Sequence, residues 1–186
     1  TCYGIAKYDN PEELSVSDRN NIGYQYTDCP LYWISVIYLN FAEAKAEMGS
    51  LTQDDLNNSI NKLQARAGLP AMTTTPDADP ANNMGVSNLI WEIRRCRRCE
   101  LIMDNWYRYW DLIRWHQLDK LDSTKYPNTM LGANVSNVPD CEEATKNGYI
   151  DASDAQIRTY EAKHYFYPIP TTQLTLNKNM KQNPGW

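Results

Sequence analysis

Glu100 and Asp111 are acidic side chains of this sequence from which a sugar-cleaving pair could be built. Glycoside hydrolases need one carboxylic acid to protonate the leaving oxygen and a second carboxylate as base or nucleophile, both in an open cleft. Arginines surround this pair, Arg108 and Arg114 among them, and nearby guanidinium groups favour the ionised form of both acids. An ionised acid is a poor proton donor, so hydrolysis by Glu100 and Asp111 is kept only as an alternative.

Cys96 and Cys99 form a Cys-x-x-Cys pair, which resembles half of a zinc site or a redox couple. Zinc would need two more ligands, and neither His116 nor His164 stands at a supporting spacing. Both cysteines fall in the middle of an expected helix, where free cysteine packs as a small hydrophobic residue. We therefore predict packing, and we assign no metal and no cofactor to the pair.

Asp77 and Asp79 offer oxygen ligands of the kind that calcium prefers, in a loop over residues 69–85 that is rich in turn formers. They lack the spacing of a dedicated calcium-binding loop. A solvated loop with two acids is the simpler interpretation, and a calcium site there is left open.

Glu100 also stands on an apolar helix face. At roughly 100° per residue, that face is made by four residues: Leu89, Ile93, Cys96 and Met103. A carboxylate among them must be paired if it is buried, and the planar fork of arginine suits it. The next segment supplies Arg108 and Arg114, with Asp111 placed to orient both. We predict a structural Glu–Arg clamp that ties two helices together.

Apolar periodicity predicts a helical hairpin before this stretch. The run of residues 31–48 predicts a helix that is buried on most sides. A second helix is expected to begin at Thr52 or Asp54 and to end at Gly68. Its core positions are expected to be Leu56, Ile60, Leu63 and Ala67. Two such helices with a short connector form an antiparallel hairpin.

The arginine-rich stretch is expected to form the next helix, with Ser87 as its N-cap. Asp104 and Asn105 are expected to break it, and residues 106–118 to form another helix. On that last helix, one face carries Trp106, Trp110 and Ile113.

Other parts of the chain lack periodicity. Residues 9–21 and 119–156 are expected to be irregular because turn formers and mixed polarity dominate them. Residues 164–186 are expected to form an extended strap, stiffened by Pro168 and Pro170 and pinned onto the helices by aromatic residues.

Charge and hydropathy exclude some function classes. The formal net charge of −5 argues against a nucleic-acid partner and against an anionic membrane surface. Arg94, Arg95, Arg97 and Arg98 stand on several sides of their helix, so they predict no continuous phosphate-binding stripe. No apolar run reaches the roughly 18 residues that a membrane span needs.

Motifs over much of the chain resemble those of the SusD/RagB family. They are RRCRRCEL at 94–101 with YRYWDLIRW at 107–115, YLNFAEA at 38–44 with INKLQARAG at 60–68, and HYFYPIP at 164–170 with the terminal NPGW. Cys96 and Gln173 depart from the pattern, since glutamate is usual at both positions.

The resemblance implies a mainly α fold of tetratricopeptide-like helical hairpins, long irregular loops and an extended C-terminal strap. It places residues 1–186 in the C-terminal part of such a protein. Within it, we expect a helical core over about 31–118, a loop region over 119–163 and the strap over 164–186.

The resemblance also implies a function without catalysis. SusD/RagB proteins are outer-membrane lipoproteins of Bacteroidetes that bind oligosaccharides at the cell surface and deliver them to a SusC-like TonB-dependent transporter. Membrane attachment is then expected only through a lipid anchor on an N-terminal part that this sequence lacks. The family's sugar contacts cannot be transferred to single residues here. A helical scaffold that binds only protein partners is the alternative outside the enzymes.

Overall fold

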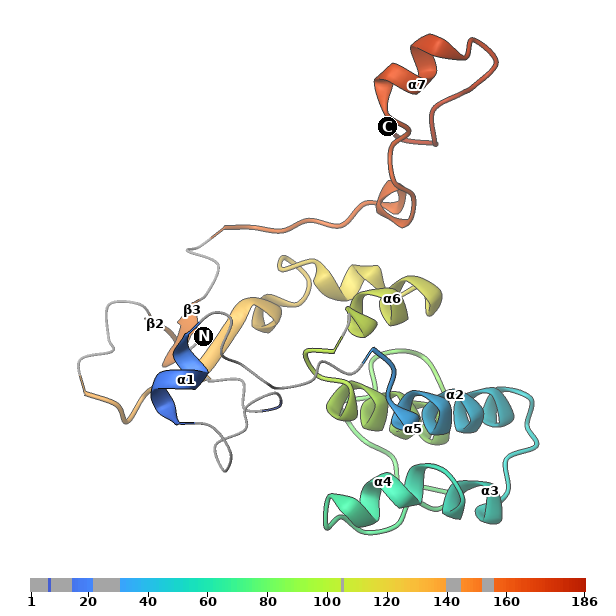
Figure 1. The fold of residues 1–186 in the computed structure, drawn as a ribbon, viewed down its shortest axis with the longest axis vertical. Coiled ribbons are helices and arrows are strands. Elements are labelled where there is room, and N and C mark those ends of the chain that lie inside the picture. The colour runs from blue at the N-terminus through green and yellow to red at the C-terminus, as the bar shows by residue number, and fades with distance from the viewer. Residues whose placement is uncertain (1–6, 8–14, 22–30, 105, 140–144, 152–155) are drawn as a thin grey trace. The chain divides into compact units, whose positions relative to one another are not determined.

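The computed structural model describes residues 7, 15–21, 31–104, 106–139, 145–151 and 156–186. The chain divides into two compact units, one of residues 28–111 and the other of residues 1–27 with 112–186. Each unit is described by itself below. Helices dominate the described residues (Figure 1), which confirms the predicted mainly α fold. No helix among the described residues is both long enough and apolar enough to cross a membrane.

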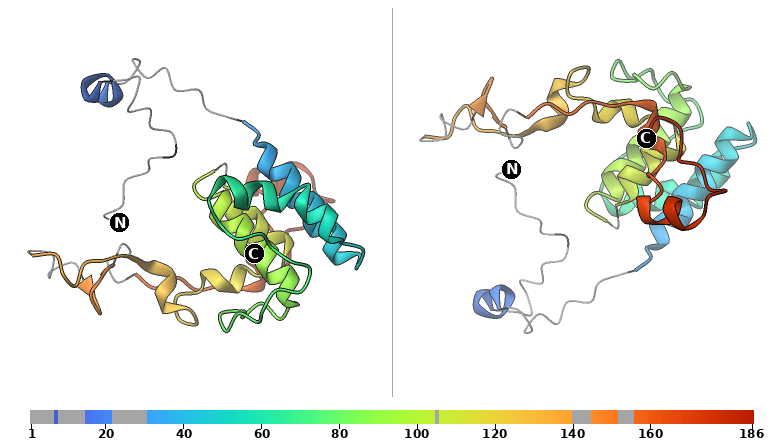
Figure 2. Two further views of the ribbon diagram at one scale, coloured as in Figure 1. Left: turned by 90° about the horizontal axis from the view of Figure 1, so that it is seen from below. Right: turned by 90° about the horizontal axis from the view of Figure 1, so that it is seen from above.

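The unit of residues 28–111 is helical. Its helices are α2 (Ile34–Glu47), α3 (Gln53–Asn57), α4 (Ile60–Arg66), α5 (Asn88–Glu100) and the first part of α6 (Tyr107–Arg114). Helices α2 and α5 lie side by side (Figures 1 and 2), and α4 packs against both. The predicted hairpin is therefore present, with α5 as a further helix packed on it.

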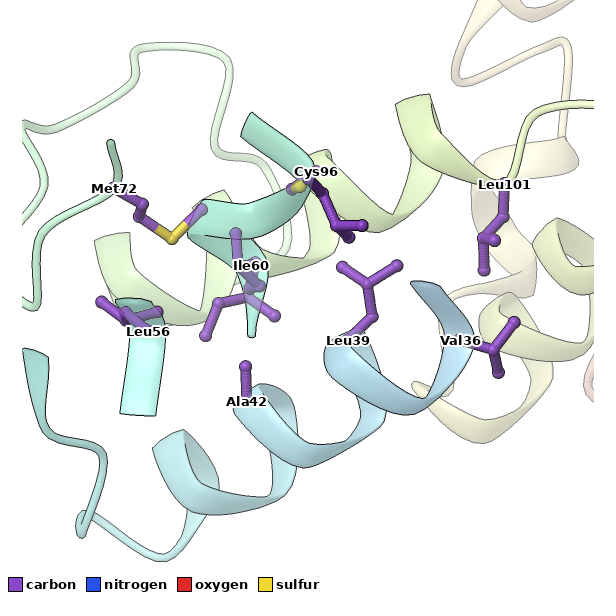
Figure 3. Packing of buried hydrophobic residues seen from close by; sticks show 10 residues of the cluster. Val36, Leu39, Ala42, Leu56, Ile60, Met72, Cys96 and Leu101 are labelled. Atoms are coloured by element: carbon purple, nitrogen blue, oxygen red, sulfur yellow. The ribbon is translucent and has the colours of Figure 1, made fainter. Parts of the chain in front are cut away.

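The core of this unit lies where side chains from α2, α3, α4 and α5 meet (Figure 3). Leu39, Leu56, Ile60 and Ile93 are completely buried there. Burial of each such side chain contributes roughly 1.5–3 kcal/mol. The helical spacing of apolar residues predicted Leu56, Ile60 and Ile93 as core positions. Leu39 was not singled out, but its helix was expected to be buried on most sides.

The second helix of the hairpin is not continuous as predicted; it is broken into α3 and α4. Thr52 begins α3 with a capping box that includes Asp55. At the break, the Asn58 side chain donates to the Asp54 carbonyl (3.0 Å) and Ser59 Oγ donates to the Asp55 carbonyl (2.6 Å). These side chains take carbonyls that a continuing helix would use, which favours an interruption at this point.

Two residues predicted on the core face are exposed, and their backbone explains why. Ala67 is the C-cap of α4, after the last helical turn. Met103 lies beyond the end of α5, with a φ of 63° and 63% exposure. Helix periodicity therefore stops before it reaches either residue.

The break between α5 and α6 falls near the predicted position. Ser87 Oγ caps α5 by accepting from the Ile90 amide (3.3 Å), as predicted. Helix α6 ends at Arg114, earlier than the predicted residue 118, because His116 has a φ of 53°. Of the predicted apolar face on α6, Trp106 (82%) and Trp110 (53%) are exposed.

The other unit contains short elements, most of them in regions predicted to be irregular or to form the extended strap. They are α1 (Val16–Asn20), the 3-10 turns η1 (Leu118–Leu121), η2 (Pro127–Met130) and η4 (Ala162–Tyr165), α7 (Thr171–Leu176), and the strands β1 (Leu131–Asn134), β2 (Thr145–Lys146) and β3 (Tyr149–Asp151). The strands form one antiparallel sheet in the order β1-β3-β2. Asn147 (φ 54°) and Gly148 (φ 79°) make the turn between β2 and β3. Asn-Gly is a strong hairpin signal that the sequence analysis missed.

The C-terminal segment folds back on itself and is not the fully extended strap that was predicted (Figure 1). The Gln182 amide exchanges two hydrogen bonds with the backbone of Ile169 (2.8 and 2.9 Å). The Trp186 indole donates to the carbonyls of Phe166 (2.9 Å) and Lys163 (3.2 Å). These bonds close the segment around α7. Its pinning onto the helices of the other unit stays a prediction.

Candidate functional site

Arg97 of α5 forms a deeply buried ion pair with Asp111 of α6. Its Nε donates to Asp111 Oδ2 (2.7 Å), and both side chains are only 5% exposed. Its Nη1 also donates to Asn40 Oδ1 of α2 (2.8 Å). The arginine lies 5.8 Å from the centre of the Tyr107 ring. One guanidinium therefore connects α2, α5 and α6.

Arg94 connects α5 to α2 in a second place. Its Nε lies 3.5 Å from Glu43 Oε1, and the two side chains are 9% and 4% exposed. Its Nη2 lies 3.4 Å from Glu47 Oε1 on the exposed side of α2. Arg94 and Arg97 thus connect neighbouring helices through ion pairs.

Glu100 is held by an arginine that the sequence analysis did not single out. Arg66 Nη2, at the end of α4, donates to both carboxylate oxygens (2.7 and 2.6 Å). The Glu100 side chain is 13% exposed and that of Arg66 is 62% exposed. The pairing of Glu100 with Arg108 or Arg114 stays a prediction. Arg66 lies in the motif INKLQARAG at 60–68, and this motif is the feature of the sequence that could have pointed to Arg66 as a partner.

Arg108 and Arg114 occupy different environments. Arg108 is half-buried, and burial together with the nearby charge of Arg98 lowers its pKa to about 10, against an opposing effect of Asp111. Arg114 is exposed, and its guanidinium carbon lies 4.7 Å from the centre of the Trp115 ring. Asp111 thus has a charged neighbour in Arg108 besides its hydrogen bond to Arg97.

A pocket of about 530 Å³ lies between α4, the loop over residues 69–77 and α5. Its apolar lining comes from the loop residues Leu69, Pro70, Ala71, Met72 and Pro76. Its polar lining consists of Gln64, Thr73, Thr75, Asp77, Glu92 and Arg95. Neither Glu100 nor Asp111 lines it, so the acids of the hydrolase alternative do not meet in this pocket.

Hydrogen bonds attach the loop that lines the pocket to helices α3 and α4. The Asn61 amide donates to the Met72 carbonyl (3.1 Å) and accepts from the Met72 amide (2.7 Å), and both residues are buried. Gln53 of α3 donates to the same Met72 carbonyl (3.0 Å). Because these bonds hold the loop within the protein itself, the pocket is largely preformed, as small-molecule sites usually are.

Asp79 makes a second set of hydrogen bonds, farther along the same loop. Asp79 accepts from the Trp91 indole (2.9 Å) and from the Ala81 amide (2.8 Å). These hydrogen bonds, that of Trp91 first, hold the pKa of Asp79 below its usual value. Asp77 lines the pocket, whereas Asp79 is bonded to Trp91 of α5 and to the Ala81 amide of its own turn. Among the described residues, no three His, Cys, Asp or Glu side chains come together as a metal site.

The charged groups on the α5 side of the pocket are paired. Arg95 Nε donates to Glu92 Oε2 (2.8 Å), and Arg95 Nη2 donates to Glu92 Oε1. The bond to Glu92 raises the pKa of Arg95 above its usual value. The pair presents oxygens and N–H groups together, which suits ligands with several hydroxyl groups.

Gln64 is the buried polar residue of the pocket. Its relative exposure is 7%, and its side-chain amide has no hydrogen-bond partner within the described part of the chain. The sequence analysis missed it, although it follows the core residue Ile60 by one helical turn. Its amide atoms keep contact with solvent, so Gln64 has free hydrogen-bonding capacity at the pocket.

Cys96 and Cys99 of α5 differ in burial. Cys96 is buried in the core, as predicted, and burial, with a contribution from Glu100, raises the pKa of its thiol to about 12. Cys99 is exposed, contrary to the packing prediction, because a step of three residues leaves it about 60° from Cys96 around the helix, beyond the edge of the core face. Both are free thiols.

Comparison with known proteins gives a consistent result. A family model described as the SusD family matches residues 1–186. The fold is similar to the crystal structure of a SusD-like protein from Bacteroides fragilis NCTC 9343, with a TM-score of 0.55 and 25% sequence identity. The match covers 82% of this chain and 25% of that protein, so this chain spans about a quarter of its length. No curated protein matches the chain.

Proposed function

The chain belongs to the SusD family, and from that membership we propose that it binds oligosaccharides at the bacterial cell surface without cleaving them. The family supports a nutrient- or glycan-binding role. We further propose that the protein delivers its ligand to a SusC-like TonB-dependent transporter. Attachment to the outer membrane as a lipoprotein is part of the same proposal.

We place the sugar contacts at the pocket between α4 and α5, and its preformed mixed lining is the observation that carries this proposal. Sugars present hydroxyl groups at the edge of the ring and C–H groups on its faces. The pocket offers matching groups, because threonine hydroxyls and the Arg95–Glu92 pair stand beside apolar loop residues. A site of this kind fixes orientation by a few polar groups and gains contact area from apolar ones.

Binding without catalysis is supported by the state of the acids. Glu92 is bonded to Arg95, Glu100 to Arg66, and Asp111 to Arg97. Acid–base cleavage of a glycosidic bond needs two carboxyl groups facing the same bond, one of them protonated. Each of these acids is instead hydrogen-bonded to an arginine of its own.

A scaffold for protein partners remains a second candidate because of one observation on α2. Ile34, Ile37 and Phe41 are 63%, 59% and 42% exposed, although the opposite face of the helix packs in the core. Exposed apolar side chains at helical spacing favour contact with another helix. This candidate predicts that ligand binding is insensitive to changes in the pocket and sensitive to changes on α2.

Calorimetric titration of the 186-residue chain with a panel of soluble oligosaccharides tests the proposed function. We expect heat of binding for at least one member of the panel and no release of reducing ends on prolonged incubation. A folded chain that binds no panel sugar would overturn the proposal. Sugar cleavage that is lost in Glu100→Gln would instead support the hydrolase.

A further inference from the structure

Gln64 has a side-chain donor and acceptor at the pocket that the described part of the chain does not use. The side chain is at least nine-tenths buried, and nothing in the described part of the chain bonds to its amide. Although the residue as a whole is largely buried, its amide atoms keep contact with solvent at the pocket, where a ligand can reach them. A ligand in the pocket that it lines would satisfy it.

The chemistry of an amide selects its partner. A glutamine side chain presents an N–H donor and a C=O acceptor next to each other in one plane. A secondary amide presents the same two groups, so the two can form a pair of hydrogen bonds with each other. A lone hydroxyl group can occupy only one of these positions well at a time. Gln64 is therefore suited to a ligand that carries an amide.

The surroundings of Gln64 indicate what the amide is attached to. Met72, which is 5% exposed, and Ala71 offer apolar contact for a methyl group beside that amide. Thr73, Thr75 and the Arg95–Glu92 pair line the same pocket and offer partners for hydroxyl groups. An acetamido group on a hydroxylated ring matches both kinds of lining.

We propose that the pocket selects acetamido sugars, with the acetamido N–H and C=O bonded to Gln64 and the ring hydroxyls facing the threonine and Arg95–Glu92 side. This inference rests on the proposed function, because it assumes that sugars bind at this pocket. It adds the substrate class, N-acetylhexosamines, and the residue that distinguishes them from unsubstituted hexoses.

The test compares ligands that differ only in the acetamido group, because this requires no change in the protein. We would titrate the 186-residue chain with N-acetylglucosamine, glucose and N-acetylglycinamide, and follow binding by NMR. Two additional hydrogen bonds correspond to roughly tenfold tighter binding of N-acetylglucosamine than of glucose. N-acetylglycinamide, which has amides but no sugar ring, is expected to bind more weakly than N-acetylglucosamine.

The variant Gln64→Met keeps the size of the side chain and removes its amide. It is expected to lose the preference for N-acetylglucosamine over glucose. The matched control is Gln173→Met, an exposed glutamine outside the pocket, which should keep the preference. The Gln64 side chain makes no hydrogen bond within the described part of the protein, and the backbone carbonyl keeps the bond from the Leu69 amide (2.9 Å) in the variant, so the replacement should not lower the melting temperature.

The outcomes separate this inference from the proposed function. Equal binding of glucose and N-acetylglucosamine, or a preference that survives in Gln64→Met, would overturn the acetamido inference and leave sugar binding intact. N-acetylglycinamide binding as tightly as the sugar would also overturn it, in favour of peptide ligands. Failure of every panel sugar to bind the folded chain would overturn both.

Discussion

Arg97 Nε donates to Asp111 Oδ2 across 2.7 Å, and each of the two side chains is 5% exposed. Glu100 is also bonded to an arginine, but that partner, Arg66, is 62% exposed. Water therefore screens the Glu100 pair and hardly reaches the Asp111 pair. The Asp111 ion pair should therefore contribute more to the stability of the fold than the Glu100 ion pair, although both acids stand in the same sequence motif.

Asp111→Asn should destabilise the helical unit by about 2–4 kcal/mol, because it leaves the buried Arg97 charge without its anionic partner. Glu100→Gln, the matched change at the half-exposed pair, should cost less than about 1 kcal/mol. Urea unfolding followed by circular dichroism measures both. A larger effect at Glu100 than at Asp111 would contradict this assignment and favour the clamp predicted around Glu100.

Asp122 is expected to make the other unit sensitive to acid. It accepts from Thr124 Oγ1 (2.5 Å), from the Tyr160 amide (3.2 Å) and from the Thr124 amide (2.9 Å). These bonds, that of the Thr124 hydroxyl first, hold the pKa of Asp122 at about 2, below its ordinary value of 3.8. A lowered folded pKa means that its stabilising contribution is present above about pH 4 and is lost as the pH falls toward 2.

The NMR shift of the Tyr160 amide proton should therefore titrate with a midpoint near pH 2. In Asp122→Asn this titration should disappear. A midpoint near pH 4 in the parent chain would mean that the carboxylate is not held by these bonds in solution.

The cysteines of α5 should differ in reactivity. Burial raises the pKa of Cys96 to about 12, so almost no thiolate is present at pH 8, whereas Cys99 is exposed. Iodoacetamide at that pH should modify Cys99 in the folded chain and leave Cys96 unmodified until urea is added. Peptide mass spectrometry distinguishes the two sites. Equal labelling of both thiols without urea would show that this part of the core is open.

Sequence patterns predicted the parts of the fold that repeat. Ile60 and Ile93 were placed in the core from helical spacing, and Ser87 was placed as a cap from its side chain. The pattern could not show that Asn58 and Ser59 interrupt a helix, because their competing hydrogen bonds depend on local geometry. The turn at Asn147 was predictable from its dipeptide and was missed.

The candidate site was harder to predict because its contacts are not periodic. Asn61 fixes the loop by hydrogen bonding to the backbone of Met72. Residues of every type offer a backbone carbonyl, so the sequence does not reveal which residue is the partner. Asp77 was noticed as an oxygen ligand, which is a property of its own side chain. Gln64 carried a readable signal, since a polar residue one turn after Ile60 breaks the apolar face in the same way as Glu100.

Filling the pocket tests its role as the sugar site. Ala71 lines the pocket and is exposed, so Ala71→Trp should occupy part of its volume without disturbing the core. The control is Ala44→Trp on the exposed side of α2, where the scaffold alternative would place a partner. Circular dichroism should show that both variants fold like the parent chain.

The decisive measurement is the dissociation constant of the tightest panel sugar for these two variants, by calorimetry. We predict that Ala71→Trp weakens binding at least roughly tenfold, equivalent to about 1.4 kcal/mol, and that Ala44→Trp leaves it unchanged. Unchanged affinity in Ala71→Trp, with or without a loss in Ala44→Trp, would contradict the assignment of this pocket as the sugar-binding site.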